Sequence, residues 1–385
     1  MRRRYRIGLT GAGLIGGVLV VVGLATLGGT AEGPISAALD EVGSWVRAVE
    51  GRIARRVRGG SRAESLEWFA SYREDSARLA SPDVVLLGGY GGGQPIADAV
   101  ALEEALGTTF PLLHTYAAWG DGAEFDFPDA FVEAVRDLGS VPVITWEPWL
   151  TTFENRLHPH LPLRTERDRG GLAGIARGDY DFYVDAWARK AAGHGEPIVL
   201  RFAHEMNDSY RYPWGQQNNG VADFIAAWRH VVDRFRAAGA DDVMWAWSPH
   251  LAYEGYWSYW PGDEYVDWIA TGALNYGTAA VWSEWYGFDQ IFGRHYMELH
   301  QVGKPILIAE FGSLAVGGDR AAWYRDALEA LPRLYPAVRG VLFFEVASDA
   351  TVTPKALDWT IADDPEVVGA VRRAIRGWPG PYGEE

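Results

Sequence analysis

The stretch "PIVLRFAHEMND", residues 197–208, contains a pattern that recurs along this chain. Its apolar run at 198–203, interrupted only by Arg201, ends directly in His204, Glu205 and Asn207. The apolar residues are continuous and do not alternate with polar ones, which is typical of a strand buried on both faces of a parallel sheet. The stretch therefore predicts a parallel strand with polar side chains at its carboxyl end.

Strand-like runs of this kind alternate with segments of helical periodicity. One such segment places Phe224, Trp228, Val232 and Phe235 on a single face. Eight runs, each followed by a loop and usually a helix, predict an α/β fold with a single (β/α)₈ TIM barrel over residues 81–380, and a doubly wound sheet is the alternative. The eight runs are 84–87, 112–116, 141–146, 198–203, 243–247, 269–276, 306–311 and 341–346.

The N-terminal segment carries a targeting pattern. Arginines at positions 2, 3, 4 and 6 precede an uncharged, mostly apolar stretch at 7–30. This stretch is long enough to cross a bilayer, and the small residues that end it also fit a signal-peptide cleavage site. Residues 1–31 are therefore predicted to be a transmembrane anchor or a signal peptide, with the rest of the chain extracytoplasmic, either membrane-anchored or secreted.

Residues 32–80 predict a polar helical spacer before the barrel. The spacer contains a basic cluster that we interpret as a solvated helix face, although it could also touch anionic headgroups or a partner. Its members are Arg52, Arg55, Arg56, Arg58 and Arg62.

Composition narrows the function. The net charge of −16 repels nucleic acid and favours a neutral ligand, while the absence of cysteine excludes disulfides and thiolate chemistry. Aromatic residues make up 13% of the chain, and their flat rings serve either core packing or sugar stacking. No zinc motif is formed, because a His-Glu-x-x-His pattern would need histidine at Asp208, and "GGYGGGQ" at 88–94 fails as a phosphate-binding loop. No metal and no cofactor are therefore expected.

Two glutamates follow or end strand-like runs on the same side of the predicted barrel. Glu205 follows the fourth run, and Glu310 lies near the end of the seventh run in "PILIAEFGS". In a barrel both side chains fall at the mouth formed by the carboxyl ends of the strands. Glycosidic bond cleavage needs such a pair, one carboxyl group to protonate the leaving oxygen and one to attack or stabilise the anomeric carbon. Each glutamate alone would equally suit a salt-bridged acid at a strand end.

Four stretches together resemble glycoside hydrolase family 26. They are "VLRFAHEMNDSYRYPWG" at 199–215, "DDVMWAWSPH" at 241–250, "WPGDEYVDWIATGALNYG" at 260–277 and "KPILIAEFGS" at 304–313. The resemblance covers about residues 83–350. It implies a (β/α)₈ barrel with retaining β-glycanase activity, as in β-mannanases and in members that act on mixed-linkage β-glucan or β-1,3-xylan.

The resemblance also implies roles for individual residues. It makes Glu205 the acid/base and Glu310 the nucleophile, with His204 bracing the acid/base and the substrate. Asn207 would hold a sugar hydroxyl or the neighbouring carboxyl group, Tyr276 would donate its phenol to Glu310, and Arg201 would pair with a strand-end acid inside the mouth. Four tryptophans are candidates for sugar stacking, with core packing as the alternative for each: Trp149, Trp214, Trp247 and Trp285.

Several positions depart from the family pattern. Phe202 and Ala203 stand where mannanases commonly carry proline and a larger aliphatic residue, and Asp208 stands where glycine is usual. Phe344 and Glu345 occupy the last strand where related barrels often place a tryptophan under the sugar. These departures weaken the case that the chain is specific for β-mannan. Glu345 could be a third carboxyl group of the site, but we expect it to be a structural acid at the strand end.

The resulting hypothesis is a monomeric retaining endo-β-glycanase that hydrolyses an extracellular β-linked polysaccharide, of the β-mannan or mixed-linkage glucan type, by double displacement. The alternative is a catalytically weak polysaccharide-binding or transglycosylating protein that serves exopolysaccharide assembly. The two glutamates favour the first hypothesis over simple binding. Sequence does not separate hydrolysis from transglycosylation, because the loops that receive the acceptor have no predictable shape.

Overall fold

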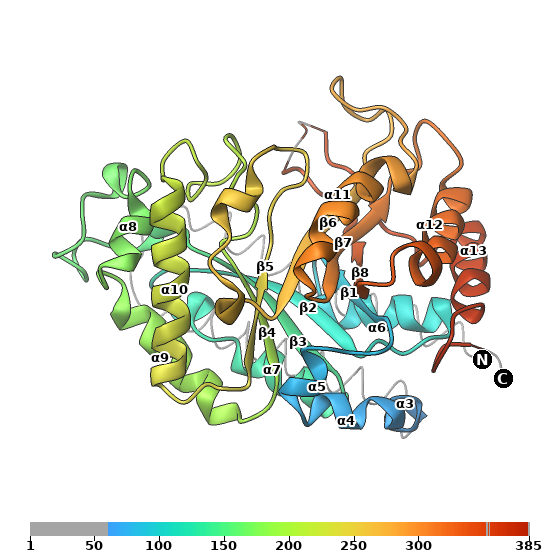
Figure 1. The fold of residues 1–385 in the computed structure, drawn as a ribbon, viewed down its shortest axis with the longest axis horizontal. Coiled ribbons are helices and arrows are strands. Elements are labelled where there is room, and N and C mark those ends of the chain that lie inside the picture. The colour runs from blue at the N-terminus through green and yellow to red at the C-terminus, as the bar shows by residue number, and fades with distance from the viewer. Residues whose placement is uncertain (1–60, 352, 354, 384–385) are drawn as a thin grey trace, which may run out of the picture. The chain divides into compact units, whose positions relative to one another are not determined.

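The strands of the protein form a closed parallel barrel. This computed structural model describes residues 61–351, 353 and 355–383. Each strand pairs with the next in parallel, and the first pairs with the last, so the order is β1 to β8 around the barrel (Figure 1). Closure confirms the predicted TIM barrel and excludes the doubly wound sheet. The strands are β1 Leu86–Gly91, β2 Leu112–Ala118, β3 Val141–Glu147, β4 Ile198–Phe202, β5 Val243–Trp247, β6 Trp268–Asn275, β7 Ile306–Ser313 and β8 Val338–Glu345.

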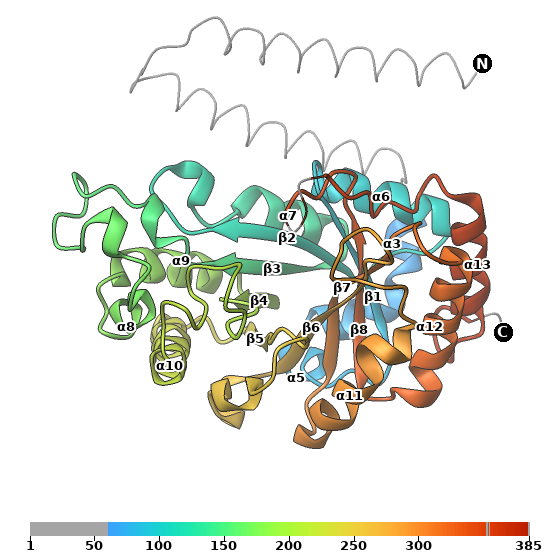
Figure 2. The same ribbon diagram turned by 90° about the horizontal axis from the view of Figure 1, so that it is seen from above.

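Helices cover the outside of the barrel (Figure 2). The apolar face expected around residue 228 lies on α10, where Phe224, Trp228, Val232 and Phe235 are all buried. A five-residue π-helix at Asp289–Gly293 runs directly into α11. The main helices are α6 Pro95–Leu106, α7 Asp129–Asp137, α8 Gly171–Ala176, α9 Asp181–His194, α10 Val221–Ala237, α11 Arg294–Leu299, α12 Arg320–Leu334 and α13 Pro365–Arg376.

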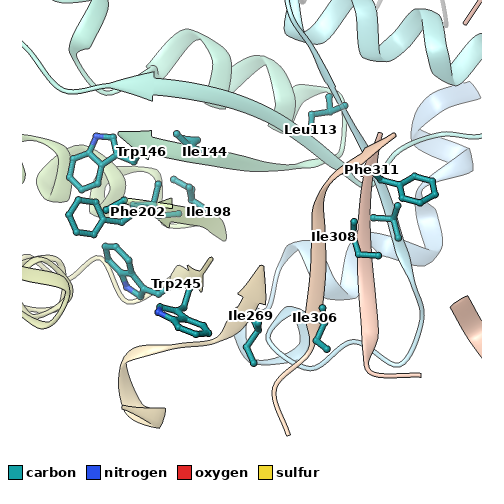
Figure 3. Close-up of a cluster of buried hydrophobic side chains, with 14 of the residues drawn as sticks. Leu113, Ile144, Trp146, Ile198, Phe202, Trp245, Ile269, Ile306, Ile308 and Phe311 are labelled. Atoms are coloured by element: carbon teal, nitrogen blue, oxygen red, sulfur yellow. The ribbon is translucent and has the colours of Figure 1, made fainter. Parts of the chain in front are cut away.

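The strand side chains alternate between two cores. In β4, Ile198, Leu200 and Phe202 point outward into the layer beneath the helices, whereas Val199 points into the barrel. Figure 3 shows part of the outer core, including Trp146 of β3. The ring of Trp146 stacks on that of Trp187 of α9, with ring centroids 4.6 Å apart. Both faces of each strand are therefore buried, which explains why the sequence runs are continuously apolar.

A register shift in β7 reverses this alternation just before Glu310. Thr271 of β6 lies opposite Ile308, and the next residue, Gly272, lies opposite Glu310, so Ala309 is an extra residue in the pairing. Ile308 and Phe311 point outward, whereas Ala309 belongs to the inner core. Strict alternation would turn Glu310 outward with Ile308. The bulge instead turns its carboxyl group into the barrel mouth, a typical use of bulges beside functional sites.

Residues 61–80 close the opposite end of the barrel. This segment contains α3 Ser61–Ser65, α4 Ala70–Arg73 and α5 Ser76–Leu79, drawn in blue in Figure 1. Leu66, Phe69, Tyr72 and Leu79 pack with the inward side chains of the strands. The segment therefore belongs to the barrel's packing unit, and the predicted spacer boundary at residue 80 falls inside that unit. These four side chains bury apolar surface against the open bottom of the barrel, which the hydrophobic effect favours.

The prediction that Arg62 faces solvent is wrong. Its side chain is buried and donates hydrogen bonds to Glu103 Oε1 at 2.9 Å and Ser140 Oγ at 2.8 Å. The ion pair with Glu103 of α6 joins the N-terminal segment to the barrel wall. The other four arginines of the cluster and the predicted anchor or signal segment lie outside the described residues. Within the part that the structure describes, no helix combines the length and apolar character needed to span a membrane.

Candidate active site

The mouth of the barrel contains a pocket of about 860 Å³. Both predicted catalytic glutamates, Glu205 and Glu310, line it. One wall comes from the loops after β4 and β5, and the other comes from the segment that links β6 to α11. The structure thus brings together two carboxyl groups that are more than a hundred residues apart in the sequence.

Glu310 lies in a cationic, hydrogen-bonded setting. Its Oε1 atom accepts hydrogen bonds from the hydroxyl of Tyr116 and from Nη1 of Arg201, both at 2.7 Å. Burial alone would raise the pKa of Glu310, but the charge of Arg201 and these hydrogen bonds outweigh burial and lower it to about 2. Glu310 is therefore ionised at neutral pH, as a nucleophile must be.

Arg201 pairs with a strand-end acid, as its place in β4 predicted. Its side chain is fully buried, with Nε donating to Ser248 at 2.8 Å while Nη1 reaches Glu310. Burial opposes its positive charge, but the neighbouring Glu310 outweighs burial and raises the pKa of Arg201 above its ordinary value. A buried ion pair of this kind is costly to break, because removing one partner leaves the other charge uncompensated.

Glu205 is held on a strained turn that follows β4. Ala203 and Glu205 have φ values of 44° and 53°, in the left-handed region that residues with a Cβ atom seldom occupy. The backbone N–H of Glu205 donates to the carbonyl of Ser248 at 2.6 Å, which ties the turn to the end of β5. Its carboxylate Oε2 accepts a hydrogen bond from Nη1 of Arg211 at 3.1 Å. Strain of this type persists where the surroundings hold it and is frequent at functional sites.

The chain is similar in sequence to known glycoside hydrolases. Residues 180–310 match the model of glycosyl hydrolase family 26. Over 299 residues the chain is 32% identical to endoglucanase H of Acetivibrio thermocellus, an alignment that covers 75% of this chain and 30% of that protein. The matched region of the chain is therefore similar to glycosyl hydrolase family 26.

Other family 26 relatives are more distant. A mannan endo-1,4-beta-mannosidase of Caldalkalibacillus mannanilyticus is 26% identical over 153 residues, which are 37% of this chain and 27% of that protein. A solved family 26 β-mannanase from Bacteroides ovatus superposes with a TM-score of 0.56 at 16% identity, covering 80% of this chain and 92% of that one. The likeness to that structure shows the fold. This chain spans less than a third of the length of either of these two curated relatives.

The expectation that Tyr276 donates a hydrogen bond to Glu310 is wrong. The phenol that donates to Glu310 belongs to Tyr116, at the mouth end of β2. Tyr276 lies just after β6 and lines the pocket, with its ring packed against Trp359 and Trp282. Tyr116 ends its apolar run in the sequence, so the rule that functional groups gather at strand ends could have found it.

The side chains of His204 and Asn207 make hydrogen bonds to other residues of the protein. Nε2 of His204 lies 3.0 Å from the hydroxyl of Tyr212, and burial together with Arg201 lowers the pKa of His204 well below its ordinary value, so the ring is neutral. Asn207 donates to the carbonyls of His250 and Tyr253 and accepts from the N–H of His250. The amide of Asn207 therefore fixes the loop after β5. This finding corrects the expectation that Asn207 contacts a sugar or Glu205.

Three of the four proposed stacking tryptophans pack within the protein. Trp247 points outward from β5, is fully buried, and packs against Trp257 and Trp260. Trp214 is buried behind His204, and its Nε1 donates to the carbonyl of that residue. Such side chains cannot reach a polymer in the pocket. Alternate positions of a strand face opposite ways, which explains why an aromatic residue at a strand end is a weak signal by itself.

Trp285 also packs against the chain and does not line the pocket. Its ring lies so close to Gly318 that a Cβ atom at that glycine would approach it to 2.3 Å. The neighbouring Trp282 and Tyr286 line the pocket instead. Trp149 remains a candidate for sugar contact, because its ring is partly buried and its Nε1 donates to the carboxyl group of Glu147 at the mouth.

Glu147 is a third carboxyl group at the mouth that the sequence reasoning missed. It ends β3, and its Oε1 lies 4.0 Å from Nδ1 of His204. Burial raises the pKa of Glu147 to about 7, and the hydrogen bond from Trp149 opposes this rise only in part. The residue follows an apolar run directly, so the strand-end rule would also have identified it.

Glu345 has the structural role that was expected of it. Its carboxylate accepts hydrogen bonds from the backbone N–H groups of Ile361 and Ala362 at 2.9–3.0 Å, which anchors the segment before α13.

Elsewhere at the mouth, side-chain atoms of Glu205, Asp208 and His250 that could bind a metal ion lie within 4.8 Å of one another. Nε of Arg211 lies 3.9 Å from Asp208, and its Nη1 contacts Glu205, so an arginine already supplies the positive charge between these two carboxylates.

The ionised Glu310 should make stability depend on acid pH. Its pKa is about 2 in the folded protein against an ordinary value of 4.5, so the unfolded chain takes up this proton first as pH falls. The stabilisation is complete above about pH 5 and falls by up to about 3 kcal/mol on the way to pH 2. Urea unfolding of the wild type and Glu310→Gln at about pH 7, 5, 4 and 3 should show the difference between the two proteins shrinking with acidity. A difference that stays constant to pH 3 would contradict the low pKa.

Proposed function

We propose that this protein is a retaining endo-β-glycanase that hydrolyses a neutral β-linked polysaccharide by double displacement. One observation carries the proposal: Glu205 and Glu310 face a single pocket, and the contacts of Glu310 with Arg201 and Tyr116 keep Glu310 ionised. Enzymes of this chemistry need one carboxylate kept ionised for attack and a second group that exchanges a proton.

In the first step Glu310 attacks the anomeric carbon. The bond between that carbon and the glycosidic oxygen breaks as the proton of Glu205 moves to the leaving oxygen, which gives a glycosyl ester on Glu310 and an ionised Glu205. In the second step Glu205 takes a proton from water while the water oxygen attacks the same carbon and Glu310 leaves. Arg201 and Tyr116 stabilise the Glu310 carboxylate at the start and at the end of this cycle.

The walls of the pocket favour a sugar polymer. Tyr210 and Trp282 both line it and are 83% and 58% exposed, so aromatic surface is accessible in the pocket. Aromatic rings of this kind stack on the apolar faces of pyranose units. The chain's charge of −16 disfavours an anionic polymer. These features support binding of an uncharged chain across the mouth, as an endo-acting enzyme requires.

The relatives rank the substrates to test. The relative named endoglucanase H aligns with 75% of this chain, whereas the mannosidase aligns with 37%. We therefore propose a β-glucan ahead of β-mannan, and we propose the mixed-linkage β-1,3-1,4 type from the family resemblance. Strand β8 contains no tryptophan that could lie under a sugar. At its mouth end it has Phe344, which is partly buried, and Glu345, which is buried.

A polysaccharide panel tests this proposal. The full-length protein is incubated with mixed-linkage β-glucan, β-1,4-glucan, β-mannan and β-1,3-xylan, and reducing ends and viscosity are followed with Glu310→Gln as the matched control. We expect release from mixed-linkage glucan, an early fall in viscosity, and a product whose anomeric configuration by NMR is that of the substrate. Release from none of the four would refute the glycanase proposal. Longer products in place of new reducing ends would indicate transglycosylation.

We also propose an extracytoplasmic location for this activity. It rests on the arginines and the apolar stretch of residues 1–31 and agrees with a polymeric substrate that cannot cross a membrane. The intact mass of the native protein distinguishes a retained anchor from a cleaved signal peptide. We propose that the enzyme acts as a monomer, which light scattering of the purified chain can test.

A further inference from the structure

Arg211 contacts the carboxylate that the proposed mechanism uses as acid/base. It lies in the loop between β4 and α10, six residues beyond Glu205. Its Nη1 donates to Oε2 of Glu205 at 3.1 Å, and its side chain is 27% exposed to the pocket. Among the described residues, Arg211 is the side chain that donates a hydrogen bond to the Glu205 carboxylate. Arg211 is not one of the residues that the family resemblance assigned to the site.

The loop around Arg211 is built to hold this position. Oδ1 of Asp208 accepts the backbone N–H groups of Tyr210 and Arg211 at 2.7 and 3.1 Å, which closes a turn directly after the Glu205 segment. The other oxygen of Asp208 lies 3.9 Å from Nε of Arg211, a longer approach than that of Nη1 to Glu205. The buried Asp208 therefore serves the backbone first, and the guanidinium is directed at Glu205.

The surrounding charges give this contact a chemical consequence. Glu205 shares the mouth with the acids Glu310 and Glu147, and burial leaves these charges poorly screened. Burial opposes the positive charge of Arg211, but Glu205 outweighs it and raises the pKa of Arg211 above its ordinary value. Arg211 is thus a permanent cation beside the carboxyl group that must give up and regain a proton during the proposed reaction.

We propose that Arg211 is a positioning residue for the acid/base: it holds Oε2 of Glu205 so that Oε1 carries the proton toward the glycosidic oxygen. When the proton leaves Oε1, the bond from Oε1 to hydrogen breaks and its electron pair stays on the carboxylate, which the guanidinium stabilises. The leaving oxygen gains the proton as its bond to the anomeric carbon breaks. Arg211 therefore helps most when the leaving group needs protonation. This inference rests on the proposed function.

Dependence on the leaving group provides the test. The protein is assayed with the polysaccharide that the wild type cleaves, and with aryl β-glycosides of the matching disaccharide that carry either 2,4-dinitrophenol or unsubstituted phenol. Dinitrophenolate departs without protonation, whereas phenol and a sugar do not. For Arg211→Met we expect kcat/KM to fall about 100-fold on the polysaccharide and the phenyl glycoside, but less than about 5-fold on the dinitrophenyl glycoside. Arg211→Lys should recover part of the loss, because it restores a cation without the second N–H.

Matched controls separate this role from loop bracing. Arg325→Met removes an exposed arginine whose partner is its neighbour Asp326, and it should leave all three values unchanged. Thermal unfolding of each variant establishes that the fold is retained. An equal loss on all three substrates, or no loss on any, would overturn the positioning role of Arg211. An inactive wild type would overturn the proposed function itself, so the two failures are distinguishable.

Discussion

Glu310→Gln should reduce turnover on the polysaccharide by about 10⁴-fold or more while the protein stays folded. The amide is not a nucleophile, yet its carbonyl oxygen can still accept the hydrogen bonds that Tyr116 and Arg201 now donate to Glu310. Turnover is measured from reducing-end release. A 2-deoxy-2-fluoro glycoside with a good leaving group should lose that group and add the mass of its fluoroglycosyl group to the wild type, at the peptide that contains Glu310.

The control for this variant is Glu329→Gln, which alters an exposed glutamate on α12 and should keep full turnover. The cost in stability should be substantial. Glu310→Gln leaves the buried Arg201 without its anion, which is worth about 3 kcal/mol by the pKa argument. Full activity in Glu310→Gln, or labelling at a different carboxyl group, would remove Glu310 from the role of nucleophile.

Glu205→Ala should reduce polysaccharide turnover by about 10³-fold, and azide should restore the reaction on an activated glycoside. Without the carboxyl group, a poor leaving group is not protonated and water is not deprotonated in the second step. A dinitrophenyl glycoside still forms the ester on Glu310, because its leaving group departs unaided. Azide can occupy the space left by the side chain and attack the ester without a base.

The product of azide rescue identifies the mechanism. A β-glycosyl azide, detected by NMR, requires attack on an α-linked ester and therefore double displacement. The control is Glu147→Gln, which changes the third carboxyl group at the mouth. Its product should contain no azide, because Glu205 remains to activate water. An α-glycosyl azide, or rescue seen only in Glu147→Gln, would contradict the assignment of Glu205 as acid/base.

The eight strands and the place of the site followed from local patterns. All eight apolar runs became strands, because a residue buried on either face of a parallel sheet must be apolar wherever it points. The position of Glu205 after the fourth run and of Glu310 in the seventh then placed both at one mouth. These inferences needed only neighbours along the chain and the known direction of strands in a barrel.

The partners of those residues did not follow from the sequence. The phenol beside Glu310 belongs to Tyr116 and not to Tyr276, and the predicted stacking residue Trp247 is fully buried. Both outcomes depend on which way a side chain faces at a strand end, and one extra residue in a strand reverses that direction. The bulge at Ala309 is such a case, because it turns Glu310 inward and leaves no mark in the apolar pattern.

Order along the chain was thus enough to specify a barrel, its open end and the two acids there, because burial and strand direction are local properties. Contacts across the mouth, such as those of Arg201 and Tyr116 with Glu310 or of Arg211 with Glu205, required the folded protein. They join segments through space, and register shifts and loop turns set their geometry. The ionised state of Glu310, on which the proposed chemistry depends, arises from its long-range contacts with Arg201 and Tyr116.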